Sequence, residues 1–149
     1  MSENHFNIRI YGLFPVDGYI LVTDEFRLGM FMTKFPGGAL EFGEGAIDCL
    51  RREFREELNS EINHISHFYT TDFYQPTTLL PKNMQLFNVY YSLHIDKPYP
   101  FKTTGKLYDI PAVDGAQSFR WMKINELKKE DFTFPVDRYI IEKIKTELR

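Results

Sequence analysis

The chain has 149 residues, of which 43% are hydrophobic and 26% are charged, and this length provides one sizeable core but not two. We therefore expect a single domain over residues 1–149. Its 18 Lys and Arg residues against 21 Asp and Glu give a net charge of −3, so no basic surface for a nucleic-acid polymer is expected.

The cysteine content and the first residues predict a cytoplasmic protein. Cys49 is the only cysteine, which excludes an internal disulfide and fits a reducing compartment. We expect this thiol to be a small packing residue. Residues 1–5 contain no basic segment that leads into an apolar run, and no stretch reaches membrane-spanning length, so we expect no membrane partner.

The first half of the chain predicts two strands followed by a glycine-rich loop. β-Branched and aromatic residues predict a strand over Phe6–Phe14. Pro15–Gly18 predicts a turn into a second strand over Tyr19–Thr23, so the two strands should form a hairpin. Four glycines between residues 37 and 45 predict a loop that bends tightly or approaches a ligand closely.

Residues 46–58 contain no Gly or Pro and predict an amphipathic helix. Asn59 follows, a residue that accepts the left-handed conformation at a helix end. The apolar side chains of this helix fall within one arc of roughly 80°. They predict a stripe that faces the core, formed by Ile47, Leu50, Phe54 and Leu58.

The second half of the chain predicts three more strands and a terminal helix. Extended segments are predicted over Ser66–Gln75, Gln85–Ile95 and Phe119–Met122. Pro135 occupies the first position of a terminal helix with an apolar residue at every fourth position. The order of strands and helices predicts an α/β or α+β fold, with a helix on each side of a mixed sheet.

Three glutamates of the first predicted helix share one face. With Glu53 at zero on the helical wheel, Glu57 lies at about +40° and Glu56 at about −60°. Like charges at these spacings destabilise a helix by a few tenths of a kcal/mol per pair. Mg²⁺ or Mn²⁺, which prefer oxygen ligands, would relieve that repulsion. Arg52, one turn before Glu56, can hydrogen-bond to its carboxylate.

The glycine loop directly before this helix can complete such a site. A carbonyl at Gly37 or Gly38 would give a cation another oxygen, and glycine lets the backbone approach a phosphate. Magnesium held by carboxylates and substrate phosphates is the usual arrangement in phosphoryl chemistry. A glutamate-rich helix face alone is more often simply solvated, so the spacing of the whole segment decides the interpretation.

Six residues of this segment reproduce the spacing of the Nudix box: Gly38, Glu44, Arg52, Glu53, Glu56 and Glu57. With residue frequencies of roughly one in fifteen, chance gives such a match in about one chain of this length in a hundred thousand. The sequence therefore resembles the MutT-like Nudix hydrolases. The resemblance implies an α/β/α sandwich and divalent-cation-dependent hydrolysis of a nucleoside diphosphate linked to another group. Asn59 and Ser60 depart from the box, and Ile62 is the expected replacement for its apolar anchor.

The resemblance also assigns roles. It implies metal-ligand roles for Glu53, Glu56 and Glu57 toward Mg²⁺ or Mn²⁺, with orienting and supporting roles for Arg52, Gly38 and Glu44 and a further oxygen from the Gly37 carbonyl. Family members differ in the residue that deprotonates the attacking water. Asp114 lies in roughly the right stretch, although a loop acid without a catalytic role is the alternative.

The substrate class is expected to be a small nucleoside diphosphate derivative: a nucleotide sugar, an ADP-ribose-like compound or a nucleoside triphosphate. Pro76 and Tyr74 each resemble a substrate marker of a different branch of the family, so these hints conflict. The aromatic share of 16% supplies candidates for base stacking, and these are Phe35, Tyr74 and Phe132, with Asp114 as a further substrate contact. A nucleotide sensor without turnover is the alternative function, and the family resemblance predicts a homodimer.

Overall fold

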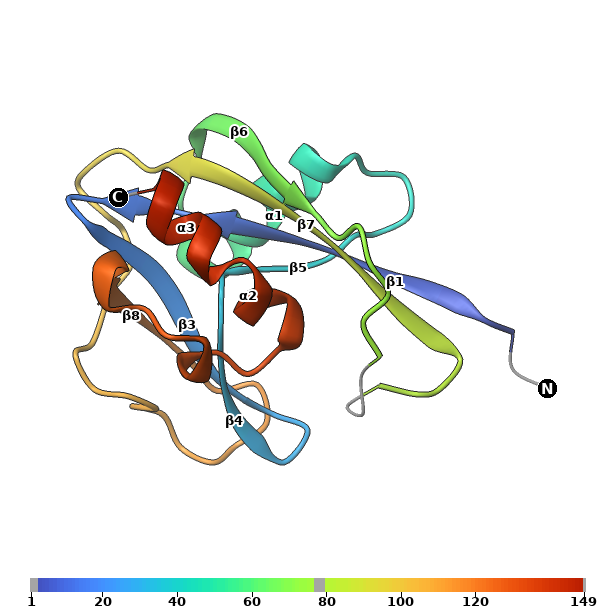
Figure 1. The fold of residues 1–149 in the computed structure, drawn as a ribbon. Helices are drawn as coiled ribbons and strands as arrows, with labels where there is room; N and C mark the ends of the chain where they lie inside the picture. Colours follow the sequence, from blue (N-terminus) through green and yellow to red (C-terminus); the bar gives the residue numbers. More distant parts are fainter. Residues whose placement is uncertain (1–2, 77–79, 149) are drawn as a thin grey trace.

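Two β-sheets lie between helices in the computed structural model, which describes residues 3–76 and 80–148 (Figure 1). The first sheet is mixed and has the order β5 (Gly37–Ala39), β1 (His5–Leu13), β7 (Met84–His94) and β6 (Asn63–Thr70). Its central strands β1 and β7 are parallel, and its outer strands are antiparallel to them. The second sheet is antiparallel around β3 (Tyr19–Arg27), which pairs with β2 (Pro15–Val16), β4 (Met30–Lys34) and β8 (Gln117–Lys123).

Helices cover opposite faces of this arrangement. The helix α1 (Ala46–Leu58) lies on one side, and α2 (Pro135–Tyr139) and α3 (Ile141–Glu147) lie on the other (Figure 1). Two short 3₁₀ helices, η1 (Ile124–Glu126) and η2 (Lys129–Asp131), connect β8 to α2. The α/β/α sandwich expected from the sequence is therefore confirmed, and no helix of the described residues is long and apolar enough to cross a membrane.

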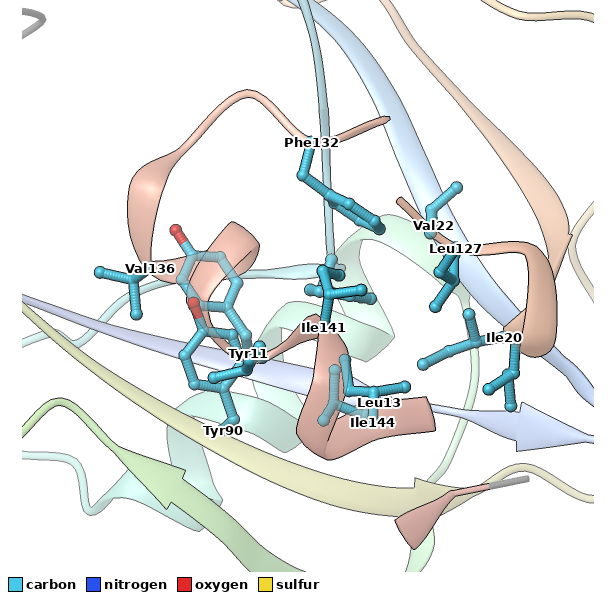
Figure 2. Close-up of a cluster of buried hydrophobic side chains, with 13 residues drawn as sticks. Tyr11, Leu13, Ile20, Val22, Tyr90, Leu127, Phe132, Val136, Ile141 and Ile144 are labelled. Atoms are coloured by element: carbon cyan, nitrogen blue, oxygen red, sulfur yellow. The ribbon is translucent and has the colours of Figure 1, made fainter. Parts of the chain in front are cut away.

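Alternation along the strands divides the core into two clusters. Ile10 packs in the cluster that contains Leu50 and Phe54 of α1, whereas the next residue, Tyr11, packs in the cluster that contains Ile141 of α3. Successive strand side chains point to opposite faces, so each central strand supplies both layers. Figure 2 shows the second cluster, where the rings of Tyr11 and Tyr90 lie next to each other and beside Val136.

The predicted first helix is confirmed over its whole length. It spans Ala46–Leu58, and Asn59 follows it with φ of 50°. Ile62 is buried, as expected for the displaced apolar anchor. The assignment of Ile47 to the core is wrong, because this side chain is 41% exposed. In the first turn of the helix, Cys49 is the buried residue instead. Its thiol contacts the carbonyl oxygen of Ala39 in β5 at 3.5 Å.

Three other expectations need correction. The predicted hairpin is confined to the predicted turn, where β2 pairs antiparallel with the start of β3, whereas β1 pairs with β5 and β7 in the other sheet. Part of the predicted glycine loop is strand β5, and a further strand, β4, precedes it. The terminal helix is divided at Ile140 into α2 and α3, although its predicted stripe is still buried at Val136, Ile140 and Ile144.

Candidate active site

Gly38 lets β5 lie close to α1. A Cβ atom added at Gly38 would collide with the carboxylate of Glu53. Any larger residue at this position would therefore displace that side chain. The requirement for glycine comes from the packing of β5 against α1, and it places the Gly38 backbone directly beside the acidic face of the helix.

Gly37 presents its backbone differently. Its φ is 149°, and a Cβ atom there would collide with the Ile10 carbonyl oxygen. Gly37 faces Tyr11 in the antiparallel register, and the adjacent pair is hydrogen-bonded through Gly12 N to Pro36 O at 2.8 Å. Because hydrogen-bonded and non-hydrogen-bonded pairs alternate, the Gly37 carbonyl points away from β1. It is thus free of the β1 ladder, as an oxygen ligand would need to be.

Arg52 organises the acids at the start of α1. Its guanidinium donates to both carboxylate oxygens of Glu44, at 2.7 and 3.0 Å, and to Glu53 Oε1 at 2.9 Å. It also donates to the Ala39 carbonyl at 3.1 Å and, as expected from the helical spacing, to Glu56 at 3.3 Å. The hydrogen bonds from Arg52 and Glu41 lower the pKa of Glu44 to about 2, so Glu44 is a permanent anion that anchors the arginine.

Glu57 lies in a different environment, half-buried near the end of α1. Burial raises the pKa of its carboxyl to about 7, and the nearby charges of Glu25 and Glu53 raise it further, against the opposing effects of Lys34 and Gln117. A carboxylate that is desolvated and placed beside two others holds its negative charge at a cost. An additional positive charge beside Glu57 would therefore stabilise its ionised form.

Glu25 is a member of the acidic cluster that sequence reasoning missed. It lies on β3, almost fully buried, and Lys34 Nζ and Arg27 Nε contact its two oxygens at 3.3 and 2.9 Å. The predicted strand ends at Thr23, four residues before the observed end of β3 at Arg27. No local sequence motif identifies Glu25 as a site residue. Glu25 comes close to α1 only because β3 pairs with β4 and β8. The other predicted ligand, Glu56, has a side chain that is 60% exposed.

The acids are gathered but do not already form a cation cage. Among residues 3–76 and 80–148, no three Asp, Glu, His or Cys side chains surround a common point with ligand spacing. Glu53 is instead held by Arg52, and Gln117 Nε2 reaches Glu25 at 3.4 Å. A cation would therefore have to draw these carboxylates away from their present donors.

A cavity of about 320 Å³ opens beside this cluster, between the mixed sheet and α2. Its lining includes Arg27 and Lys34, the two partners of Glu25, and the predicted residue Asp114 at its exposed rim. Tyr74 does not line it, because this ring is 66% exposed and borders a neighbouring hollow at the ends of β1 and β7. Phe35 and Phe132 do not line it either.

The prediction that Phe35 and Phe132 grip a base needs correction. Both rings are fully buried and stack on each other, with centroids 4.8 Å apart. They belong to the core cluster under α2 and α3 (Figure 2). Aromatic residues bury large areas and dominate cores, and here the packing of the terminal helices uses these two rings.

The fold and the site together define a two-sheet α/β/α sandwich with an acidic helix face beside a cavity. The NUDIX domain family matches residues 3–144, and the chain belongs to this family. It is thus a NUDIX hydrolase, an enzyme that acts on pyrophosphate bonds of nucleoside diphosphate derivatives. No curated protein matches the chain in sequence.

Solved structures share the fold at low sequence identity. A NUDIX hydrolase from Nitrosomonas europaea is 19% identical with a TM-score of 0.72, over 97% of this chain and 92% of that chain. A MutT NUDIX hydrolase from Burkholderia pseudomallei is 14% identical with a TM-score of 0.71, over 95% and 99% of the two chains. The ORF135 protein of E. coli is 18% identical with a TM-score of 0.61, over 93% and 88%.

Proposed function

We propose that the chain is a pyrophosphohydrolase that requires Mg²⁺ or Mn²⁺ and cleaves a small nucleoside diphosphate derivative at the acidic face of α1. The observation that carries this proposal is the position of Glu57. Its half-buried carboxyl lies near Glu25 and Glu53, and burial followed by the charges of these neighbours raises its pKa to about 7. Such an arrangement is unfavourable in isolation and becomes favourable once a cation shares the oxygens.

The donor set fits a hard divalent cation. Carboxylate oxygens and the free Gly37 carbonyl are the ligand types that Mg²⁺ and Mn²⁺ prefer. In the proposed site, Glu53, Glu56 and Glu57 would hold the cation, which supplies activation of the attacking water and charge stabilisation on the diphosphate. Glu25 is a further carboxylate near Glu57, because its charge helps to raise the pKa of Glu57.

The remaining residues would shape and support the site. Arg52 keeps Glu53 and Glu56 pointing to one side through its hydrogen bonds of 2.9 and 3.3 Å. Glu44 fixes the arginine, and Gly38 leaves room for Glu53. Arg27 and Lys34, at the edge of the cavity, are placed to bind substrate phosphates as charged hydrogen-bond donors.

A substrate screen with one matched pair of variants tests the proposal. Nucleotide sugars, ADP-ribose-like compounds and nucleoside triphosphates are incubated with Mg²⁺ or Mn²⁺, and the products are identified by mass spectrometry. Glu57→Gln should lower turnover by at least about 100-fold, the scale of losing one charge-stabilising group. Glu61→Gln, an exposed acid that pairs with Arg55 at 2.7 Å, should leave turnover unchanged. Equal turnover by the wild type and Glu57→Gln would refute the assignment.

The homodimer and the cytoplasmic location stay predictions. Light scattering coupled to size-exclusion chromatography tests the first, with a mass of twice 17.7 kDa expected.

A further inference from the structure

The cavity beside the acidic cluster has a polar wall of three buried side chains from two elements. Asn88 and Tyr90 lie on β7, and Asp137 lies on α2, each with almost no exposed surface. Asn88 and Asp137 line the cavity directly. Figure 2 shows the hydroxyl of Tyr90 pointing toward the helix segment that carries Val136, the residue before Asp137. Buried polar groups of this kind are normally fully hydrogen-bonded.

The hydrogen bonds within this wall fix the direction of each group. The Tyr90 hydroxyl donates its single proton to Asp137 Oδ1 at 2.6 Å. The hydroxyl oxygen can then only accept, and it does so from Asn88 Nδ2 at 3.3 Å. If the Asn88 amide were turned over, two oxygens without a proton between them would meet. The network therefore places Asn88 Oδ1 on the side away from Tyr90.

Asn88 Oδ1 is the acceptor that this orientation leaves over. It is buried and unpaired among the described residues. The backbone of Asn88 cannot move to relieve this, because its N–H donates to Thr71 Oγ1 at 3.0 Å and its carbonyl accepts from Thr71 N at 2.9 Å. An unmet buried acceptor is unfavourable for folding, so its retention at a cavity wall points to a ligand that donates to it.

Asp137 adds a second acceptor to the same wall. Only its Oδ1 oxygen receives a hydrogen bond within the described part of the chain. Asn88 Oδ1 and Asp137 therefore present hydrogen-bond acceptors at this wall, and the Asn88 amide nitrogen already donates to Tyr90. The apolar part of the lining comes from Met32, Leu86 and Val136, which suits a flat ring. Arg9 and Lys34, whose charges act on Asp137, also line the cavity.

The cavity also reaches the acidic cluster. Arg27 and Lys34 line it and contact Glu25, and Glu25 acts on Glu57. A nucleotide with its phosphates near Arg27 and Lys34 can thus place its base against Asn88 and Asp137. The volume of about 320 Å³ falls in the range of small-molecule sites.

We propose that Asn88 and Asp137 select a nucleobase that carries an exocyclic amino group, over a base with a carbonyl or a hydrogen in its place. The proposal rests on the proposed function only for the presence of a nucleotide. An amino group donates two protons and satisfies the unpaired acceptors. A carbonyl at that position would face them with a lone pair, and a hydrogen would leave them unpaired, so both are disfavoured.

Binding of nucleoside monophosphates without divalent cations tests the proposal separately from hydrolysis. Three pairs differ at an amino position: cytidine against uridine, adenosine against inosine, and guanosine against inosine monophosphates. In the first two pairs a carbonyl replaces the amino group and the adjacent ring nitrogen gains a proton, whereas in the third pair a hydrogen replaces the amino group and nothing else changes. Titrations followed by NMR or calorimetry give the Kd values. We expect about tenfold tighter binding of the amino-bearing member in at least one pair, the effect of one hydrogen bond of this kind. No preference in any pair, or no binding at millimolar concentration, would overturn the proposal.

Two variants and a matched control identify the residues responsible. Asn88→Leu should remove the preference without lowering thermal stability, because it also removes an unpaired acceptor. In Asp137→Asn, the amide oxygen can still accept the proton of the Tyr90 hydroxyl, and the amide NH₂ group replaces the second carboxylate oxygen. The NH₂ group is a donor, so this variant should shift the preference toward the carbonyl-bearing base. Asp72→Asn alters the same kind of pair, an acceptor for Tyr69 at 2.6 Å, but on the exposed surface, and should change nothing.

The outcomes separate this proposal from the proposed function. An unchanged preference in both Asn88→Leu and Asp137→Asn would refute the role of the wall, even if the enzyme hydrolyses nucleotides. If the wild type hydrolyses none of the substrates but still prefers the amino-bearing base, the proposed function is refuted and the role of Asn88 and Asp137 stands.

Discussion

Replacing Glu57 by Gln should stabilise the cation-free protein at alkaline pH while abolishing its activity. The structure raises the pKa of Glu57 from its ordinary value of 4.5 to about 7, through burial and then the charges of Glu25 and Glu53. A carboxyl with a raised pKa in the folded state binds more protons than it does in the unfolded chain. Its stabilising contribution is complete below pH 4.5 and is lost as the pH rises through about 7.

The magnitude follows from the size of this pKa difference. At 1.36 kcal/mol per pH unit, the full difference between 4.5 and about 7 corresponds to about 3 kcal/mol. The unfolded chain is already largely ionised at pH 5, so about 2 kcal/mol is expected between pH 5 and pH 8. Gln cannot ionise, and the variant should therefore gain this amount relative to the wild type over that range.

Chemical denaturation of both proteins in a chelating buffer measures the effect. The difference in free energy of unfolding, variant minus wild type, should grow by about 2 kcal/mol from pH 5 to pH 8. Glu61→Gln is the control. Arg55 lowers the pKa of the Glu61 carboxyl, so the difference in free energy of unfolding for this variant should not grow between pH 5 and pH 8. Saturating Mg²⁺ should stabilise the wild type more at pH 8 than at pH 5, since the ionised form is the ligand. A difference that does not change with pH would refute the reasoning.

Three further predictions concern the same region. Gly38→Ala should weaken Mn²⁺ binding, measured by calorimetry, by about tenfold or more, because its Cβ would displace Glu53. Arg52→Lys should lower the free energy of unfolding by about 1 to 3 kcal/mol in denaturant titrations, since lysine cannot make the two-pronged contact with Glu44. Cys49 should resist a thiol reagent at pH 8 in the native state and react only after unfolding, because burial raises its pKa to about 12. Rapid labelling of the folded protein would contradict the last prediction.

The local part of the site could be predicted from the sequence because its residues are close along the chain. Helical spacing placed Glu53 and Glu57 on one face, and the helix bounds and the left-handed Asn59 followed from propensities of single residues. The hydrogen bond from Arg52 to Glu56 followed from the same spacing. These features are all determined within one helix and the residues next to it in the sequence.

The parts that failed depend on which strands become neighbours. Glu25 joins the acidic cluster only because β3 pairs with β4 and β8. Phe35 and Phe132 are distant in sequence, and their stacking in the core follows from the docking of the terminal helices. Asn88 looks like an ordinary strand residue until Tyr90 and Asp137 orient its amide. Pairing over long sequence separation is not encoded in any local pattern.

Arg27 and Lys34 contact Glu25 and also line the cavity, so they couple the acidic cluster to the cavity. A phosphate that enters the cavity competes with Glu25 for these cations, whose contacts with it are 2.9 and 3.3 Å. Glu25 would then carry an uncompensated charge beside Glu57, and the attraction of the acidic cluster for a divalent cation would increase. By thermodynamic linkage, cation binding must strengthen phosphate binding by the same factor. Substrate and metal are therefore expected to bind cooperatively, so that neither half of the site is fully assembled without the other.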